Sequence, residues 1–243
     1  RLHAIRSVDS GFISNVDFGV NYTERSKSRQ SIEAMLCLKD CTGGMHGVTA
    51  PFPGNIQDFD FGGIGKLGVF DADQQLAAGT WNRVYKYHQD IAAKNWSVDE
   101  ELTTVYFKAS VDTDWHGMPL RGNFGAQYVG VDQSSEGLST FSGNPAGSLT
   151  HAGTSYSEFL PSMNLGQEVI DNMVARLALA RQMARPRMDQ MRAGMDVGIN
   201  QENQWSAGGG NPRLRPWLAN ASDIALEEYF STEAGHRGYF GAA

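Results

Sequence analysis

The stretch SNVDFGVNYTER, residues 14–25, alternates between apolar and polar side chains with a period of two. Its apolar members, Val16, Phe18, Val20 and Tyr22, share one face of an extended chain, while Asn, Asp, Gly and Thr residues share the other. This alternation is typical of a β-strand with one apolar face and one wetted face. The stretch therefore predicts a strand that separates two different environments.

Other segments extend this pattern along the chain. Strands are expected at 97–112, 121–135, 156–168, 173–185 and 221–231, with another starting near Arg237. The connections alternate between long ones, at 26–96, 135–155 and 186–220, and short turns. Antiparallel strands need only a short turn, so this alternation predicts one plain end and one end with elaborate loops. An outer-membrane β-barrel has this form, with short periplasmic turns and long external loops.

One segment has a second interpretation. Residues 168–196 are rich in Ala, Leu, Arg, Met and Gln, which all favour helices. Read alone, they would form an amphipathic helix that breaks at Pro186. The residues alone leave helix and strand open here.

Composition excludes several classes of protein. The chain has 243 residues and 41% hydrophobic residues, enough to bury a sizeable core in one or two domains. Its net charge is −7 and its basic residues are scattered, so nucleic acid is not expected as a partner. It lacks the long apolar run of a transmembrane helix, which leaves insertion as a β-barrel open.

A glycine pattern at residues 61–68, FGGIGKLG, matches the G-x-G-x-x-G of dinucleotide-binding loops. Such a loop follows a buried parallel strand, whereas PFPGNIQDFDFGG precedes it here. Pro51, Pro53 and Gly54 interrupt that approach. We therefore interpret the glycines as part of a loop, and no cofactor is predicted.

The two cysteines, Cys37 and Cys41, lie close together in the sequence. They are compatible with a redox pair, with two metal ligands or with a disulfide. A structural disulfide in an oxidising compartment is favoured. The six histidines are dispersed, so no metal site is predicted.

No motif with supporting context indicates catalysis, so the chain is not expected to be an enzyme. The charge run Asp99, Glu100 and Glu101 is interpreted as a solvated rim at the start of a strand.

Several later segments resemble a known family. They are SYSEFLPSMNL (155–165), ARLALARQMARP (175–186), GGNPRLRPWLANASDIALEEYF (209–230) and MPLRGNFGAQYVGVDQSS (118–135). In this order they resemble the late barrel strands of TonB-dependent outer-membrane receptors, especially the branch abundant in Xanthomonas- and Caulobacter-like bacteria.

The resemblance implies an all-β fold: an antiparallel transmembrane barrel segment, part of a barrel of about 22 strands. It also implies that 173–185 is a strand. Arg176, Ala178, Ala180 and Gln182 would then face the lumen, and Leu177, Leu179 and Met183 the lipid. The plug domain is expected to be absent from residues 1–243, so contact with the TonB complex would depend on an N-terminal plug region outside this chain.

Candidate ligand-binding residues fall into two groups. Exposed aromatic rings suit the apolar faces of sugars or of a chelate, and Trp81, Tyr85, Tyr87 and Trp96 of the long connection are candidates. Packing within the loop, or a membrane-interface position for Trp96, is the alternative. Residues predicted to face the lumen are Asn15, Asp17, Asn21, Arg176 and Glu227. Glu227 is a candidate to bind a cation or to pair with Arg176.

These observations favour a transport receptor that contacts outer-membrane lipid and takes up a scarce nutrient, either a carbohydrate or a ferric siderophore. A secreted β-rich carbohydrate-binding module is the main alternative. A small redox or nucleotide enzyme is a third.

Overall fold

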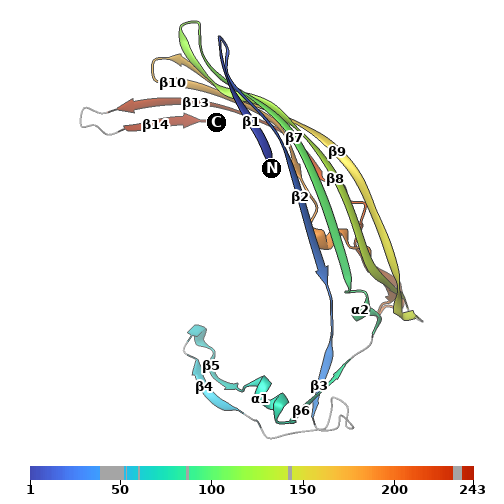
Figure 1. Cartoon of the computed structure of the whole chain (residues 1–243). Coiled ribbons are helices and arrows are strands. Elements are labelled where there is room, and N and C mark those ends of the chain that lie inside the picture. Colours follow the sequence, from blue (N-terminus) through green and yellow to red (C-terminus); the bar gives the residue numbers. More distant parts are fainter. Residues whose placement is uncertain (39–51, 53, 60, 86–87, 142–143, 232–236) are drawn as a thin grey trace.

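The chain forms a long curved wall of antiparallel strands (Figure 1). The computed structural model describes residues 1–38, 52, 54–59, 61–85, 88–141, 144–231 and 237–243. In that part, one sheet of ten strands follows the order β1-β2-β7-β8-β9-β10-β13-β14, with β11 paired to β8 and β12 paired to β11. Its main strands are β1 (Leu2–Ser10), β2 (Ile13–Arg29), β7 (Trp96–Trp115), β8 (Met118–Phe141), β9 (Asn144–Ile170), β10 (Met173–Ala184), β13 (Trp217–Ser231) and β14 (Arg237–Ala242). The prediction of an all-β fold is confirmed.

One end of the wall carries only tight turns, and we call it the short-turn end. Between β7 and β8, His116 and Gly117 both have positive φ, 54° and 79°, as a two-residue hairpin turn requires. Gly11 and Asn172 have positive φ in the turns β1–β2 and β9–β10. The opposite end, which we call the long-loop end, carries the elaborate connections.

The strand β1, which pairs with β2, was not predicted from the sequence.

The segment with two interpretations is a strand. β10 pairs with β9 from Met173 to Ala180 and with β13 from Met173 to Ala184. Its helix propensity is overridden because β13 pairs with the whole strand and β9 with its first two thirds, and a marginal local preference does not outweigh these backbone partners.

The connection predicted at 135–155 is mostly strand, which corrects that expectation. β8 continues to Phe141 and β9 begins at Asn144, so the two strands form one very long hairpin. Thr, Ser and Gly are common in this part and alternate with few apolar residues. The sequence therefore lacked the apolar alternation that identified the other strands.

The connection at 26–96 contains small elements of its own. β3 (Ala34–Leu38) pairs with β6 (Trp81–Tyr85), and β4 (Asn55–Phe59) pairs with β5 (Gly65–Val69). Between these lie η1 (Phe61–Gly63) and α1 (Ala72–Ala77), and α2 (Gln89–Ala92) leads into β7. β4, β5 and α1 extend away from the wall (Figure 1).

The glycine pattern of FGGIGKLG makes the turn of the β4–β5 hairpin. Gly62, Gly63 and Gly65 have φ values of 67°, 70° and 76°, which only glycine adopts easily. The turn contains the single 3-10 turn η1, and no α-helix begins in it: the next helix, α1, is capped by Asp71 after β5 has ended. The interpretation as loop is corrected in part: the pattern lies in the long connection, but Gly65 and Gly68 belong to β5 and the approach at Asn55–Phe59 is β4, so this part is a hairpin.

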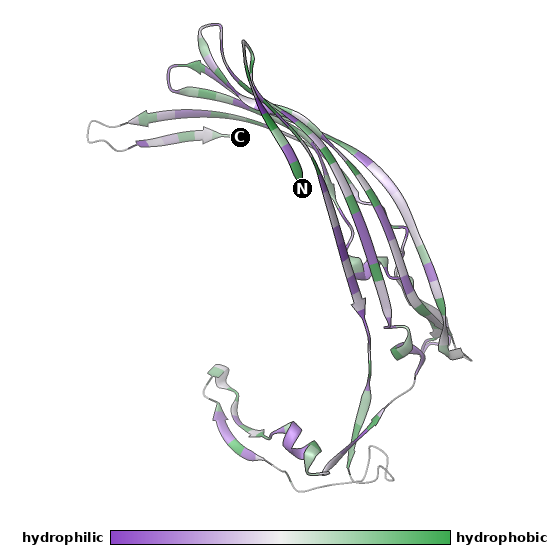
Figure 2. Cartoon of the chain, viewed as in Figure 1, coloured by the Kyte–Doolittle hydropathy of each residue, from purple (hydrophilic) through white to green (hydrophobic). Residues whose placement is uncertain are grey.

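The sheet has one apolar face and one polar face in its short-turn half. On the apolar face, Phe18 lies opposite Phe107, Val20 opposite Val105, and Val105 opposite Tyr128. The band continues across β9, β10 and β13, and its exposed members include Phe18, Val20, Tyr22, Val105, Phe107, Tyr128, Phe159, Leu179, Ile224 and Leu226. Figure 2 shows the alternation of hydrophobic and hydrophilic residues along these strands.

The apolar band ends abruptly toward the long loops. One same-face position beyond Tyr22, and two beyond Tyr128, this face carries Glu24, Glu101 and Asp132, which lie directly opposite one another on β2, β7 and β8. Like charges in such cross-strand positions repel and need water around them. This boundary separates an apolar zone from a wet zone along the strands.

The ladder between β9 and β10 stops near the same boundary. The last pair is Ala180 with Ser162, and the next residue of β9 is Pro161, which has no N–H to donate. Beyond this point β10 and β13 stay together while β9 stays with β8. A shallow groove of about 500 Å³ lies at the split, lined by residues that include Leu179 and Asn220.

Two remaining expectations concern the cysteines and the helices. Cys37 is disulfide-bonded, while Cys41, its predicted partner, lies outside the described residues. In the described parts of the chain, no helix is both long and apolar enough to cross a membrane.

Candidate functional site

Polar side chains on the face opposite the apolar band form a connected network near the short-turn end. Asp17 is only 9% exposed. Its carboxylate accepts a hydrogen bond from the Tyr106 hydroxyl at 3.3 Å and lies 3.8 Å from Lys108 Nζ and 3.9 Å from His3 Nδ1. Asp17 is therefore held by the wall itself.

The other residues predicted to face the lumen lie on this polar face. The strand register puts Asn15 and Asn21 on the same side of β2 as Asp17, and Asn21 donates to Thr23 Oγ1 at 3.0 Å. Arg176 Nε donates to Glu227 at 2.8 Å, and the Tyr229 hydroxyl donates to the same carboxylate oxygen at 2.6 Å. The predicted pairing of Arg176 with Glu227 is confirmed, and their role toward a ligand stays a prediction.

The connection after β10 folds back over the polar face at the long-loop end. We call residues 185–216 the inward segment. It contains η2 (Met188–Met191), β11 (Met195–Ile199) and β12 (Trp205–Gly209). β11 pairs in parallel with the end of β8, from Ser139 to Phe141, and η2 lies against the wall (Figure 1).

A buried carboxylate fastens this segment to the wall. Glu100 on β7 is fully buried. Its Oε2 accepts from Arg25 Nε of β2 and from Arg185 Nη1, the latter at 2.6 Å. Because an unpaired buried charge is costly, Glu100 keeps β2, β7 and the start of the inward segment together. The interpretation of Asp99–Glu101 as a solvated rim is wrong for Glu100, since only its two neighbours are exposed.

Neutral groups complete the attachment. Gln133 Nε2 donates to the carbonyl oxygens of Pro212 and Leu214 at 2.8 and 2.9 Å. The Ser135 hydroxyl donates to Ser97 O at 2.6 Å and accepts from the Ala193 N–H at 2.9 Å. The inward segment is therefore bonded to the wall through backbone groups near both of its ends, as a fixed part of the structure.

Two apolar clusters lie beneath the inward segment. Trp96 and Val98 of β7 pack with Met191 of η2, and Met188 and Leu214 pack against them. The second cluster is centred on Leu102, Val129, Val131 and Tyr156, with Met183 packed against it. Met183 was expected to face lipid and does not. β10 leaves β9 after Ala180, and this departure brings the later side chains of β10 toward the opposite face.

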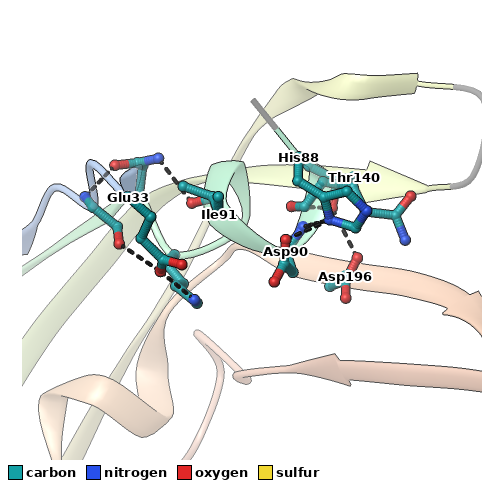
Figure 3. Close-up of polar contacts among 10 residues, drawn as sticks. Glu33, His88, Asp90, Ile91, Thr140 and Asp196 are labelled. Carbon is teal, nitrogen blue, oxygen red and sulfur yellow. Dashed lines mark hydrogen bonds and ion pairs between the residues drawn. The ribbon is translucent and has the colours of Figure 1, made fainter. Parts of the chain in front are cut away.

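The long connection joins the wall at a polar junction around α2 (Figure 3). Asn95 Oδ1 accepts from the Ser31 N–H at 2.8 Å, and Asn95 Nδ2 donates to the carbonyl of Ala92 at 3.0 Å. The Thr140 hydroxyl at the end of β8 contacts both the Gln89 carbonyl and Asp196 Oδ1 of β11, each at 3.1 Å. The junction thus connects the long connection, β8 and the inward segment.

A cavity of about 310 Å³ opens beside this junction. Its lining combines an aromatic ring, an imidazole, a carboxylate and apolar groups, contributed by Tyr85, His88, Glu33, Ile91 and Leu138 among others. Tyr85 is 62% exposed. A mixed lining of this kind is usual for a small-molecule site, and this cavity is the candidate site on the long connection.

Two carboxylates at the junction have lowered pKa values. The Lys94 ammonium donates a hydrogen bond to Glu33 and holds the pKa of that carboxyl below its ordinary value. At Asp90, partial desolvation acts to raise the pKa, but the contact with His88, the nearby Lys94 charge and the Ile91 N–H together outweigh it, and the pKa is lowered. Both groups are therefore ionised at neutral pH.

The junction should consequently loosen in acid. A lowered pKa of Glu33 stabilises the folded junction above the ordinary Glu pKa of about 4.3, and this stabilisation is lost as the pH falls through the lowered value. We expect the protection factors of the α2 amides, which compare the measured exchange rate with that of an unstructured chain at the same pH, to fall below about pH 4, as measured by hydrogen exchange. Glu33→Gln should remove the contribution of this carboxylate, and an unchanged pH profile in that variant would contradict the assignment.

The predicted aromatic residues have different environments. Trp81 and Tyr85 lie at the two ends of β6, and Tyr85 borders the cavity. Trp96 is only 8% exposed, packs with Val98 and Met191, and is covered by Lys27, whose Nζ lies 5.9 Å from the ring centroid. It is a core residue and is not available to a ligand. Tyr87 lies outside the described residues.

The described residues contain no group of three or more His, Cys, Asp or Glu side chains able to hold a metal ion. Glu100, Gln133 and Ser135 were not predicted as important. The sequence indicated them only weakly. They are polar residues at positions that strand alternation places on the same face as Val98, Leu102 and Val131.

The comparisons with known proteins agree with this two-faced sheet. The family model described as TonB dependent receptor-like, beta-barrel matches residues 8–243. The chain belongs to this family. Comparison with curated proteins and with solved structures gave no match.

Members of the TonB-dependent receptor family are outer-membrane transporters and not enzymes. In a barrel of this family, the apolar face is the exterior and the polar face lines the lumen. The inward segment of this receptor barrel thus lies on the lumen side of the wall.

Proposed function

We propose that this chain forms part of the barrel wall and external loops of a receptor in the outer membrane of a Gram-negative bacterium. The receptor takes up a scarce nutrient with energy from the TonB complex, which it contacts through an N-terminal plug region. The observation that carries the proposal is the apolar band of β2, β7 and β8 backed by a polar, ion-paired face. On this proposal the short turns are periplasmic, and 26–96 and 186–220 are external.

The proposed ligand is a carbohydrate, with a ferric siderophore as the second candidate. Trp81 and Tyr85 are supplied by the same face of β6, and aromatic rings bind the apolar faces of sugars. The cavity beside Tyr85 adds Ser31, Glu33 and Asn95, whose oxygen and nitrogen atoms suit sugar hydroxyl groups. We further propose membership of the Xanthomonas- and Caulobacter-type branch, in which carbohydrates are a frequent substrate class.

The lumen-facing residues have a second proposed role. Asn15, Asp17 and Asn21 of β2, and Arg176 and Glu227 of β10 and β13, would contact the plug or a passing ligand. Their present partners are neighbouring wall residues, so contact with a ligand would require exchange of hydrogen bonds.

Uptake can be tested in the bacterium. Deleting the coding sequence of this chain should abolish growth on one carbohydrate as the sole carbon source at low concentration, and loss of TonB should have the same effect. Growth that fails only when iron is scarce would assign a siderophore instead. Normal growth of the deletion strain under both limitations would contradict the proposal.

The alternative of a secreted carbohydrate-binding module predicts a soluble fold. The exposed band that includes Phe18, Phe107 and Tyr128 disfavours it, because contiguous apolar patches of this kind are unusual on soluble monomers. The chain should therefore require detergent to remain dispersed. A monodisperse chain in detergent-free buffer would favour the secreted module.

A further inference from the structure

Positive charge gathers in the part of the chain that folds into the lumen. The stretch from Arg181 to Trp217 contains six arginines and three acidic residues, although the whole chain has a net charge of −7. This local excess is opposite in sign to the protein as a whole. It therefore requires a local explanation.

Most of these arginines have partners within the wall. Arg185 shares Glu100 with Arg25, and Arg187 makes two contacts with Asp189 at 3.1 and 3.2 Å. Arg181 and Arg215 both approach Glu158, at 3.4 Å each. Glu100 and Glu158 are each shared by two arginines. The inward segment and the wall beside it therefore keep an excess of positive charge.

Arg213 and Arg215 are both exposed and lie two residues apart, whereas Arg187, the side chain of which is 77% exposed, is engaged by both oxygens of Asp189. The residues on either side of them face the wall: Leu214 packs on the cluster around Met191, and Pro212 and Pro216 are half-buried. Arg213 is exposed, and its guanidinium has no hydrogen bond or ion pair to any other residue that the structure describes. The side chain of Arg215 is 65% exposed, with Cζ 5.8 Å from the centroid of the Tyr156 ring.

The backbone that carries this pair is held firmly. Gln133, which is 5% exposed, binds the carbonyls on either side of Arg213. The Arg213 N–H donates to Asn211 Oδ1 at 2.9 Å, and the Asn211 N–H donates to Gln190 O at 2.8 Å. A fixed backbone reduces the entropy lost when its side chains engage a ligand.

We propose that Arg213 and Arg215 bind an anionic group of the imported ligand. Guanidinium groups bind carboxylates and related anions through paired, charge-assisted hydrogen bonds. The ligand is then an acidic oligosaccharide or an anionic ferric siderophore, and a neutral sugar is not the preferred ligand. This inference rests on the proposed uptake function and specifies the chemistry of its ligand.

The test uses the receptor that contains this chain, in detergent, and three probes: tri-galacturonate, a neutral galactose trisaccharide of the same length, and a ferric tris-catecholate. Titration calorimetry should show binding of one anionic probe, and tighter binding of it than of the neutral trisaccharide. The double variant Arg213→Gln/Arg215→Gln should weaken that binding about tenfold or more. Raising the salt concentration should weaken it in the unmodified chain as well.

Arg121→Gln supplies the matched control. Arg121 lies near the short-turn end of β8, is 74% exposed and pairs with Asp112 at 3.2 Å. Its replacement removes one positive charge, as each replacement in the double variant does. It should leave affinity for the anionic probe unchanged. An equal loss in this control would mean that only overall charge matters, and would overturn the site.

The remaining outcomes separate the inference from the proposed function. Equal or tighter binding of the neutral trisaccharide would overturn the anionic preference while leaving carbohydrate uptake in place. Failure of all three probes would contradict both ligand classes. Binding that is insensitive to salt in the unmodified chain would overturn the inference even if the double variant fails to fold.

Discussion

Glu100→Gln should lower the free energy of unfolding by about 3 kcal/mol, because it removes the carboxylate that Arg25 and Arg185 share. We expect the lower end of the range for broken buried ion pairs. Both arginines keep part of their side chains exposed, 34% and 27%, and can recover some hydration. Urea titration of the chain in phospholipid vesicles measures the change.

The same variant should release the inward segment before the rest of the sheet unfolds. Arg185 opens that segment, and Glu100 is its charged contact with β7. Limited proteolysis should therefore cut within 186–214 faster than in the unmodified chain. An unchanged rate would show that Gln133 and Ser135 are sufficient to hold the segment.

Glu101→Gln is the matched control for Glu100. The two residues are adjacent on β7, but Glu101 is exposed on the other face, directly opposite Glu24 and Asp132. Removing its charge relieves repulsion between like charges, so stability should be unchanged or should rise by a few tenths of a kcal/mol. A loss as large as that of Glu100→Gln would contradict the buried-clamp interpretation.

Phe107→Lys should be the second strongly destabilising change. Phe107 lies in the apolar band between Phe18 and Ala126, where a lysine would face hydrocarbon. The expected cost is about 2–4 kcal/mol in a phospholipid bilayer. Urea titration in vesicles gives the value.

Ser110→Lys provides the comparison on the same strand. Ser110 lies opposite Asn15 and Asn123 on the polar face, so a lysine there stays in a wet environment and should cost no more than about 0.5 kcal/mol. Equal costs at the two positions would mean that the apolar face does not contact lipid, and would favour a soluble sheet.

Much of the wall could be predicted because strand alternation is a local property. Phe18, Val20 and Tyr22 were assigned to the apolar face from their spacing alone, and the structure leaves all three exposed there. The strand at 173–185 required the family resemblance, since its residues favour a helix. The outer part of the β8–β9 hairpin, at 135–155, was not predicted as strand. Its residues lie beyond the apolar zone, so apolar and polar side chains do not alternate there.

The candidate site was harder to predict because it depends on contacts between distant residues. Trp96 was expected to be a ligand-binding aromatic, but Met191, far along the chain, covers it. Glu100 was read with its two neighbours as a solvated run, and only the return of Arg185 shows that it is buried. In both cases the deciding partner comes from the inward segment, whose course no local pattern indicates.

Residue order alone predicts an apolar face and a polar face for the strands that alternate clearly, because side-chain direction in a strand follows directly from residue order. Which polar residues are structural and which are presented to the lumen depends on tertiary contacts. Glu100 and Gln133 became internal anchors and Arg213 and Arg215 became exposed. The physical reason is that burial and charge pairing depend on where a long connection returns to the wall.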